Sequence, residues 1–184
     1  MTTTSFRRRA LLTIATAGLL VAAAPRAWTR PPTDHEVKAA FLLHFTRLID
    51  WPAVAPEEPF VVAVLGNDPF AEVLESVAGR DAKKRTLRIV RYESLDRITV
   101  RPQVLFVGAD NAAEARRVCA AMGNAPVLTV SDLPGFAQGG GMIGFRLTDD
   151  GRVTFDVNVA KSQAAGLRIS SQLLKVARIV EARR

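Results

Sequence analysis

The chain has 184 residues, of which 48% are hydrophobic and 23% are charged. This composition excludes a disordered chain, and the length suits one domain with a hydrophobic core of its own. The formal net charge is +7, but residues 1–27 hold four arginines and no acidic residue, which leaves 7 − 4 = +3 for the rest. An excess that small argues against a nucleic-acid-binding protein.

Residues 1–27 have the pattern of a signal peptide. Arg7–Arg9 form a basic segment, and the apolar or small stretch Ala10–Ala24 behind it is shorter than the ~20 residues a membrane span needs. Pro25 disfavours cleavage directly after Ala24, so we expect cleavage after Ala23 or Ala27. The arginines fit a twin-arginine leader and an arginine-rich Sec leader equally well, so the export route stays open. An uncleaved anchor is the alternative.

The mature part begins with a predicted helix. Thr33 and Glu36 have the spacing of a capping box, and Trp51-Pro52 ends the helical pattern. His44 falls among apolar residues on one predicted face, where we interpret it as a core or interface histidine. The residues predicted to share that face are Val37, Ala40, Phe41, His44, Phe45 and Leu48.

Strands and helices then alternate. Apolar runs predict strands at 60–65, 87–90, 104–107 and 127–130, with helices beginning near Phe70 and spanning 112–122. This order predicts a mostly parallel sheet with helices on both faces, an α/β three-layer sandwich in a single domain over residues 33–183. Asp149-Asp150-Gly151 predicts a hairpin that adds an antiparallel pair, Met142–Leu147 and Val153–Val157, at one edge of the sheet.

The last predicted element is an amphipathic helix. Its apolar side chains recur at helical spacing and are Leu173, Leu174, Val176, Ala177 and Val180. We expect this helix to be docked on the fold.

The sequence contains no recognisable catalytic pattern. Ser131-Asp132 has no nearby histidine and no nucleophile-elbow glycines around it. His35 and His44 are nine residues apart, which places them on opposite sides of a helix and gives no metal-ligand spacing. We therefore expect neither an enzyme nor a metal or cofactor site.

Two glycine-containing segments lie where α/β folds bind ligands or bend. Gly66-Asn67-Asp68-Pro69 follows a strand, but it has one glycine, and Asp68 would repel a phosphate, so a helix cap is the favoured interpretation. Gly139–Gly141 lacks the lysine and hydroxyl residue of a phosphate loop, and we expect it to permit a bend and a close backbone approach.

The basic run Lys83-Lys84-Arg85, with Arg80, Arg88 and Arg91 nearby, is interpreted as a solvated face, with an acidic partner or envelope polymer as the alternative. Cys119 is the sole cysteine, so no disulfide can form within the chain. We expect it to be a small buried apolar residue.

Three groups of residues resemble a known family. They are Glu36–Phe41 with Phe45 and Trp51-Pro52; Val64–Gly66 with Asp68–Phe70; and Val130–Asp132, Pro134–Phe136, Gly140–Ile143, Phe145, Ala165–Ser171 and Leu173-Leu174. Together they resemble the YfiR family, small periplasmic proteins long catalogued as a domain of unknown function. His44 departs from the polar residue expected there.

This resemblance implies a non-enzymatic periplasmic regulator in cyclic-di-GMP signalling. Its partner would be an inner-membrane diguanylate cyclase or histidine kinase, bound through the periplasmic sensor region. A homodimer of the regulator itself is compatible with the resemblance. The candidate contact residues are Asp132, Pro134, Phe136, Gln138, Arg146, Arg168, Ser170 and Ser171.

Some of these residues have structural alternatives. Ser170 could cap a helix, and Phe136 could belong to the core, although we favour a contact role for Phe136 and Gln138. Asp132 either pairs with Arg168 or faces a partner, because neither charge can be buried unpaired. The alternative function is a periplasmic small-molecule-binding protein, or a hydrolase with an unidentified site, whose ligand would lie in the crevice near Asp68 and Asp132.

Overall fold

A computed structural model describes residues 30–52, 58–66 and 70–182. The predicted signal peptide and Asp68 therefore lie outside the described residues. Helix α1 spans Asp34–Leu48, and its predicted capping box is confirmed. The Thr33 hydroxyl accepts from the Glu36 amide at 3.3 Å, and the Glu36 carboxylate accepts from the Thr33 amide at 2.7 Å.

The buried face of α1 differs from the predicted one. It consists of Lys38, Ala39, Leu42, Phe45 and Thr46, a stripe with spacings of three and four residues. His44 lies outside this stripe and is exposed, so the interpretation of His44 as a core histidine is wrong. Phe41 misled the assignment, because it is only half-buried at the flank of the helix while Leu42 points to the core.

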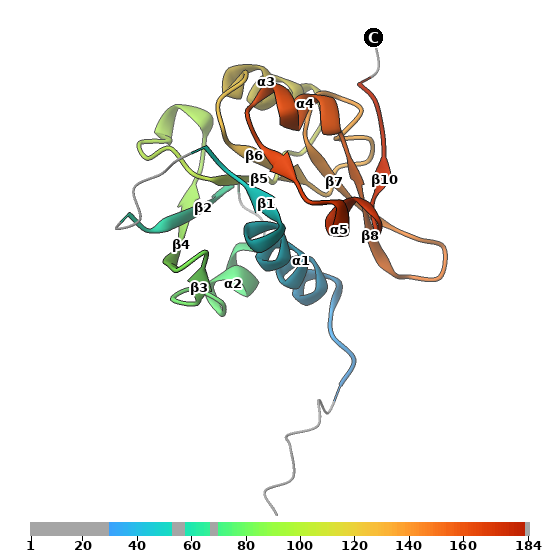
Figure 1. Cartoon of the computed structure of the whole chain (residues 1–184), viewed down its shortest axis with the longest axis horizontal. Helices are drawn as coiled ribbons and strands as arrows, with labels where there is room; N and C mark the ends of the chain where they lie inside the picture. The colour runs from blue at the N-terminus through green and yellow to red at the C-terminus, as the bar shows by residue number, and fades with distance from the viewer. Residues whose placement is uncertain (1–29, 53–57, 67–69, 183–184) are drawn as a thin grey trace, which may run out of the picture. The chain divides into compact units, whose positions relative to one another are not determined.

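Eight strands form the main sheet, in the order β10-β8-β7-β6-β5-β2-β4-β3 (Figure 1). Their bounds are β2 Phe60–Leu65, β3 Asp81–Ala82, β4 Arg85–Tyr92, β5 Val104–Val107, β6 Leu128–Ser131, β7 Ile143–Leu147, β8 Val153–Val157 and β10 Arg178–Ile179. The five strands from β4 to β7 are parallel. The predicted hairpin supplies an antiparallel β8, and β3 is antiparallel to β4.

The remaining elements are short apart from α3. They are α2 Phe70–Glu75, the 3-10 turn η1 Leu95–Arg97, α3 Ala112–Met122, α4 Val159–Ala164 and α5 Ser171–Leu174. Two further strands, β1 Ile49–Asp50 and β9 Arg168–Ile169, form a separate antiparallel pair. This small sheet joins the end of α1 to the C-terminal segment.

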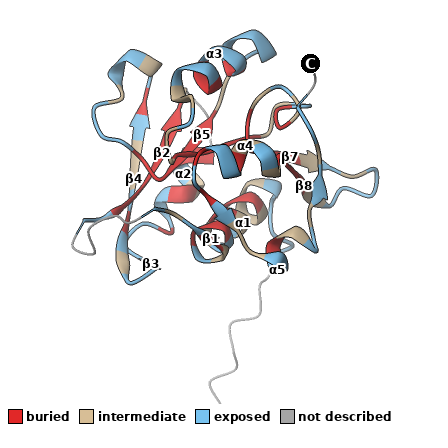
Figure 2. Cartoon of the chain, turned by 45° about the horizontal axis from the view of Figure 1, so that its top comes forward, coloured by how far each residue is buried: buried red, intermediate tan, exposed pale blue. Residues whose placement is uncertain are grey.

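The sheet is covered on both faces, as the alternation of strands and helices predicted. Val62 and Val64 of β2 join the core beneath α1 and α2, whereas Ala63 and Leu65 join a second core beneath α3. All six residues of β2 are buried, as expected for a central parallel strand. Burial follows the central strands and the inner faces of the helices (Figure 2).

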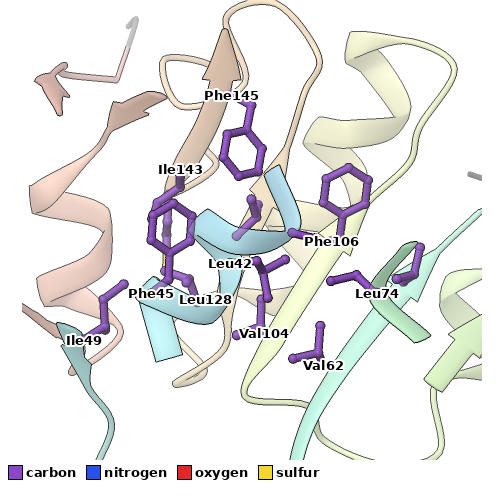
Figure 3. Close-up of a cluster of buried hydrophobic side chains, with 14 of the residues drawn as sticks. Leu42, Phe45, Ile49, Val62, Leu74, Val104, Phe106, Leu128, Ile143 and Phe145 are labelled. Carbon is purple, nitrogen blue, oxygen red and sulfur yellow. The ribbon is translucent and has the colours of Figure 1, made fainter. Parts of the chain in front are cut away.

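Large apolar side chains fill the core beneath α1. Phe45 stacks on Phe145 with ring centroids 5.9 Å apart and meets Phe155 edge-on at 5.1 Å. Figure 3 shows Leu42 and Phe45 from α1 among apolar side chains of the sheet, such as Val104, Leu128 and Ile143. This packing fixes α1 over β5–β8.

The predicted C-terminal helix is wrong beyond Leu174. Helix α5 ends there, and the chain extends into β10, which pairs in parallel with β8. The Val180 amide donates to the Val157 carbonyl at 2.9 Å, and the Arg178 side chain pairs with Asp156. These contacts outweigh the helical spacing of the apolar residues, and β10 rather than the hairpin forms the edge of the sheet.

Candidate functional site

The segment after β6 leaves the sheet at Ser131. The buried Ser131 hydroxyl donates to the Val107 carbonyl at 2.7 Å and accepts from the Leu133 amide at 3.2 Å, which turns the chain away from the strand direction. The strand-end loop, residues 132–141, follows and carries four of the predicted contact residues.

Phe136 belongs to the core and not to the surface. Its side chain is 5% exposed, so the prediction that Phe136 faces outward is wrong. The reason lies in the glycine segment, because a Cβ built on Gly141 would stand 2.1 Å from the Phe136 ring. The ring occupies the space that a side chain at 141 would need, which confirms the structural interpretation of Gly139–Gly141.

A buried carboxylate organises the end of the sheet. The Asp156 side chain in β8 is 3% exposed and accepts from Arg146 Nε and Arg178 Nε, both at 2.8 Å. Arg178 also donates to Asp156 through Nη2, and Gln138 donates through Nε2 at 3.3 Å. Three separate segments thus meet at one carboxylate, which we call the Asp156 cluster: Gln138, Arg146, Asp156 and Arg178.

The charge of Asp156 is stabilised in place. Burial raises the pKa of its carboxyl, but the hydrogen bonds from Arg178 and Arg146 outweigh burial, so the pKa lies below its usual value. Asp156 is therefore ionised at neutral pH. Because two guanidinium groups share one carboxylate, the cluster carries one net positive charge.

Asp132 pairs with a residue that sequence reasoning did not single out. Lys38 Nζ of α1 donates to Asp132 Oδ2 at 2.7 Å, and the Lys38 side chain is 10% exposed. The predicted pairing of Asp132 with Arg168 is wrong, because Arg168 is exposed and lies opposite Asp50 in the small β1–β9 sheet. The Lys38–Asp132 pair ties the start of α1 to the strand-end loop.

The Lys38–Asp132 pair and the Asp156 cluster border the same cleft, which has a volume of about 500 Å³. Pro134 and Gly135 line it from the strand-end loop, and Phe145 and Leu147 line it from β7. Leu147 is 53% exposed, whereas Phe145 is buried. We call this the β7 cleft; it combines a guanidinium pair, a salt bridge and accessible apolar surface.

A second cleft of about 390 Å³ lies between α3 and the strand-end loop. Ala112, Ala115 and Arg116 line it from the helix, and Leu133 and Gln138 line it from the loop. Its lining is mainly apolar, and Arg116 is exposed at this helix face.

The predicted contact residues fall into two groups. Asp132, Pro134 and Arg146 line the β7 cleft, and Gln138 reaches it through Asp156. Ser170 caps α5, as its structural alternative predicted, by accepting from the Leu173 amide at 3.3 Å. Arg168 and Ser171 are exposed near the small β1–β9 sheet and line neither cleft.

Sequence reasoning missed Lys38, Asp156 and Arg178. Asp156 carried a usable signal, because it stands between Phe155 and Val157 in a strand whose neighbouring positions are buried. An acidic residue there must find a cationic partner. Lys38 offered a weaker signal as the one charged residue in the buried stripe of α1.

Two other expectations concern reactive groups. Cys119 is buried, and burial raises the pKa of its thiol to about 11, so the thiolate is scarce at neutral pH. Within the described residues, no group of three or more His, Cys, Asp or Glu side chains is arranged to hold a metal ion.

The pair of guanidinium groups at the β7 cleft suits recognition of an acidic group.

In the basic run, three of the side chains have partners. Lys83 pairs with Asp50, Arg91 pairs with Glu75, and Arg85 donates to the Pro59 carbonyl at 2.7 Å. Lys83 and Lys84 form the tight turn between β3 and β4 with φ values of 55° and 63°. The run thus forms the turn between β3 and β4, and its exposed side chains are consistent with a solvated face.

Comparison with known protein families identifies the chain. The model of the YfiR/HmsC-like family matches residues 35–178, which cover the described elements from the second residue of α1 to the first residue of β10. A search of curated proteins gives no match. In the part of the chain that the structure describes, no helix is long and apolar enough to cross a membrane.

Proteins of the YfiR/HmsC-like family are periplasmic and regulatory, and they act with a membrane signalling partner. The match spans well over half of the chain, from the first turn of α1 into β10. The chain described here therefore belongs to the YfiR/HmsC-like family.

Proposed function

We propose that this protein is exported, loses residues 1–27 and acts in the periplasm as a non-enzymatic regulator. Its partner is the periplasmic sensor region of an inner-membrane diguanylate cyclase or histidine kinase, and residues 33–183 act as a single domain. The observation that carries the proposal is the family match over residues 35–178. The basic, apolar leader supports export.

The β7 cleft is the surface we propose for this contact. Arginine is enriched where proteins bind one another, and the fully buried centre of an interface is more apolar than its rim. Here Arg146 and Arg178 have side chains 32% and 52% exposed, and Leu147 stands beside them. Three of the residues predicted from sequence, Asp132, Pro134 and Arg146, line the same cleft.

The mechanism is a population shift in the partner. A regulator that binds the inactive conformation of the sensor region more tightly than the active one holds the partner inactive. Moving the partner from 1:99 to 99:1 requires a difference of about 5.5 kcal/mol between the two binding free energies. A cleft anchored by charged groups can discriminate in this way, because a small displacement of an acidic partner group breaks its contacts.

The proposal is tested with the exported protein in its own cells. Mature protein is cross-linked in the periplasm and purified with its membrane partner, and the cyclase or kinase activity of that partner is measured with and without the regulator. We expect the partner to be a cyclase or kinase whose activity falls on binding. A partner of another class, or activity that does not change, contradicts the proposal.

Export is tested separately by N-terminal sequencing of the periplasmic fraction. We expect the mature chain to start at Ala24 or Trp28, and an intact Met1 contradicts leader removal. Replacing Arg8 and Arg9 by lysine should block export by the twin-arginine route and spare export by Sec. This variant decides the route without changing the mature protein.

A second candidate function is supported by the cleft between α3 and the strand-end loop. Its volume of about 390 Å³ and its apolar lining are typical of small-molecule sites, and Arg116 could hold an acidic group. A small-molecule receptor would show a rise in melting temperature with a bound metabolite, and an Arg116→Ala variant would lose that rise. Without such a rise in a metabolite screen, the regulatory proposal stands alone.

A further inference from the structure

Strand β7 has an open edge inside the β7 cleft. It pairs with β6 only at Val130↔Ile143 and Ser131↔Gly144, because β6 ends at Ser131. Strand β7 nevertheless continues to Leu147, paired with β8 along its whole length. Among the described strands, none lies beside the second half of β7 on the β6 side.

The hydrogen-bonding pattern shows which main-chain groups face this open edge. The main-chain amide of Thr148 donates to the Arg152 carbonyl at 2.9 Å, and the main-chain amide of Asn158 donates to the Met142 carbonyl at 2.8 Å. In an antiparallel pair, hydrogen-bonded and non-hydrogen-bonded residues alternate, so Leu147 lies at a position that does not bond to β8. Its N–H and C=O groups therefore point towards the place that β6 leaves empty.

Side chains from both faces of the sheet border this gap. Phe145 and Leu147 lie on the α1 side, and Arg146 lies on the opposite side with Asp156. Such alternation is what an extended chain meets when it lies beside a strand edge. A cleft of about 500 Å³ has room for a few residues of extended chain.

The charges of the cleft select the occupant. Lys38 and Asp132 neutralise each other, whereas Arg146 and Arg178 share the single carboxylate of Asp156. Arg146 uses only Nε for that contact, and no acceptor among the described residues pairs with its terminal nitrogens. One positive charge and its free donors thus remain beside the open edge.

We propose that the open edge of β7 binds an extended segment of the membrane partner that carries an aspartate or glutamate side chain. The segment forms main-chain hydrogen bonds with Leu147, and its carboxylate pairs with Arg146 at the mouth of the Asp156 cluster. This inference rests on the proposed function, since it specifies the chemistry of the partner segment that the regulator recognises.

The test uses two opposite charges at one exposed position. Leu147→Asp and Leu147→Lys are prepared in the full mature protein, and binding to the purified periplasmic region of the captured partner is measured. We expect Leu147→Asp to weaken binding by about tenfold, because like charges at an interface repel, and Leu147→Lys to bind at least as well as the wild type. Both variants should have the melting temperature of the wild type, since Leu147 is 53% exposed.

Arg152→Glu is the matched control. Arg152 lies in the same hairpin with a side chain 83% exposed and pairs with Asp150, outside the cleft. We expect no change in affinity for this variant, although it alters the net charge by more than Leu147→Asp does. A loss as large as that of Leu147→Asp would mean that binding depends on net charge alone, and would overturn the proposed site.

The two proposals fail in distinguishable ways. If the wild type binds the partner but the Asp and Lys variants bind equally, the regulatory function stands and the acidic segment is refuted. If the wild type does not bind the periplasmic region of any cyclase or kinase, both proposals fall.

A cross-link identifies the segment directly. A photoreactive benzoylphenylalanine at position 147 should capture a partner peptide containing Asp or Glu, and the same group at Val100 should not. Val100 is a suitable control because it is 39% exposed and precedes β5, at the opposite end of the parallel strands. A captured peptide without an acidic residue overturns the inference.

Discussion

The two ends of the sheet are held together by different forces. The strands from β4 to β6 are joined to α1, α2 and α3 almost entirely by apolar side chains, among them Val62, Leu105 and Phe106. The β8–β10 end depends in addition on Asp156, which connects the strand-end loop, β7 and the C-terminal segment. Burial of apolar surface is non-directional, whereas a shared carboxylate fixes which segments meet. Stability and specificity are thus concentrated in different regions.

The largest effect is expected in the apolar core beneath α1, which continues under β7 and β8 and is shared by both ends of the sheet. Phe45→Ala removes a fully buried ring that packs against Phe145 and Phe155. We expect a loss of about 3–5 kcal/mol in the free energy of unfolding, measured by urea denaturation. This corresponds to a fall of roughly 6–20 °C in melting temperature for a domain of this size.

A matched control lies on the same helix. His44→Ala changes a neighbouring ring that is exposed, and we expect a change below about 0.5 kcal/mol. Comparable losses in the two variants would mean that α1 does not present the Phe45 side to the sheet.

The second effect concerns the packing of the strand-end loop. Gly141→Ala places a Cβ 2.1 Å from the Phe136 ring, so the ring or the loop must move. We expect a loss of about 1–3 kcal/mol, as for other overpacked sites, and recovery of much of it in the double variant with Phe136→Leu. Calorimetry of the three variants measures this coupling.

Gly139→Ala separates overpacking from loss of a glycine. Its Cβ would meet the nearest atom, the Gly135 carbonyl oxygen, at 3.4 Å, an ordinary contact distance. A loss from Gly139→Ala equal to that from Gly141→Ala would show that loop flexibility, and not the Phe136 ring, determines the result.

The third effect tests the charged end of the sheet. Asp156→Asn removes the charge that Arg146 and Arg178 share, and we expect a loss of about 1–3 kcal/mol at pH 7. Asp150→Asn is the control, because Asp150 pairs with the exposed Arg152 and should not measurably affect stability.

Comparing Asp156→Asn with the wild type also tests a predicted pH dependence of the unfolding free energy. Because the folded-state pKa of Asp156 is lowered, its ionised form contributes stability that is fully present above the unfolded-state pKa of about 3.9 and is lost as pH falls through the folded-state value. The difference in unfolding free energy between wild type and Asp156→Asn should therefore shrink on acidification. A difference that is the same at pH 7 and at pH 3 would contradict the assigned charge.

The smallest effect is expected at an exposed apolar residue of the charged end. Val176→Ser changes a side chain that is 63% exposed and follows α5, so we expect a change in stability below about 0.5 kcal/mol. Thermal unfolding measures it. A larger loss would show that Val176 docks against another part of the chain.

The difference between the two regions also explains what could be predicted. The predicted ranges of α3, β2 and β5 agree with the structure, because the apolar runs that mark the strands, and the segment left between them for a helix, are local signals. The face of α1 was misplaced because Phe41, Leu42 and Phe45 fit more than one helical stripe. Helix α5 was extended too far because helical spacing is also compatible with a short edge strand.

The charged contacts could not be assigned from sequence, for a physical reason. Lys38 and Asp132 are separated by 94 residues, and Arg178 lies 22 residues from Asp156. The pairing of a buried charge depends on which segments the apolar core brings together, so it becomes visible only after the fold is known. Buried charges in apolar surroundings, such as Asp156, can be recognised in sequence, but their partners cannot.

The single buried thiol has a practical consequence. Cys119 is the sole cysteine, and its raised pKa of about 11 makes it a poor nucleophile at neutral pH. A cysteine introduced on the surface would therefore be the only fast-reacting thiol, and a fluorophore or spin label could be attached there without first removing a native residue. Distances between such a label on the regulator and a second label on a membrane protein could then follow docking and release in real time.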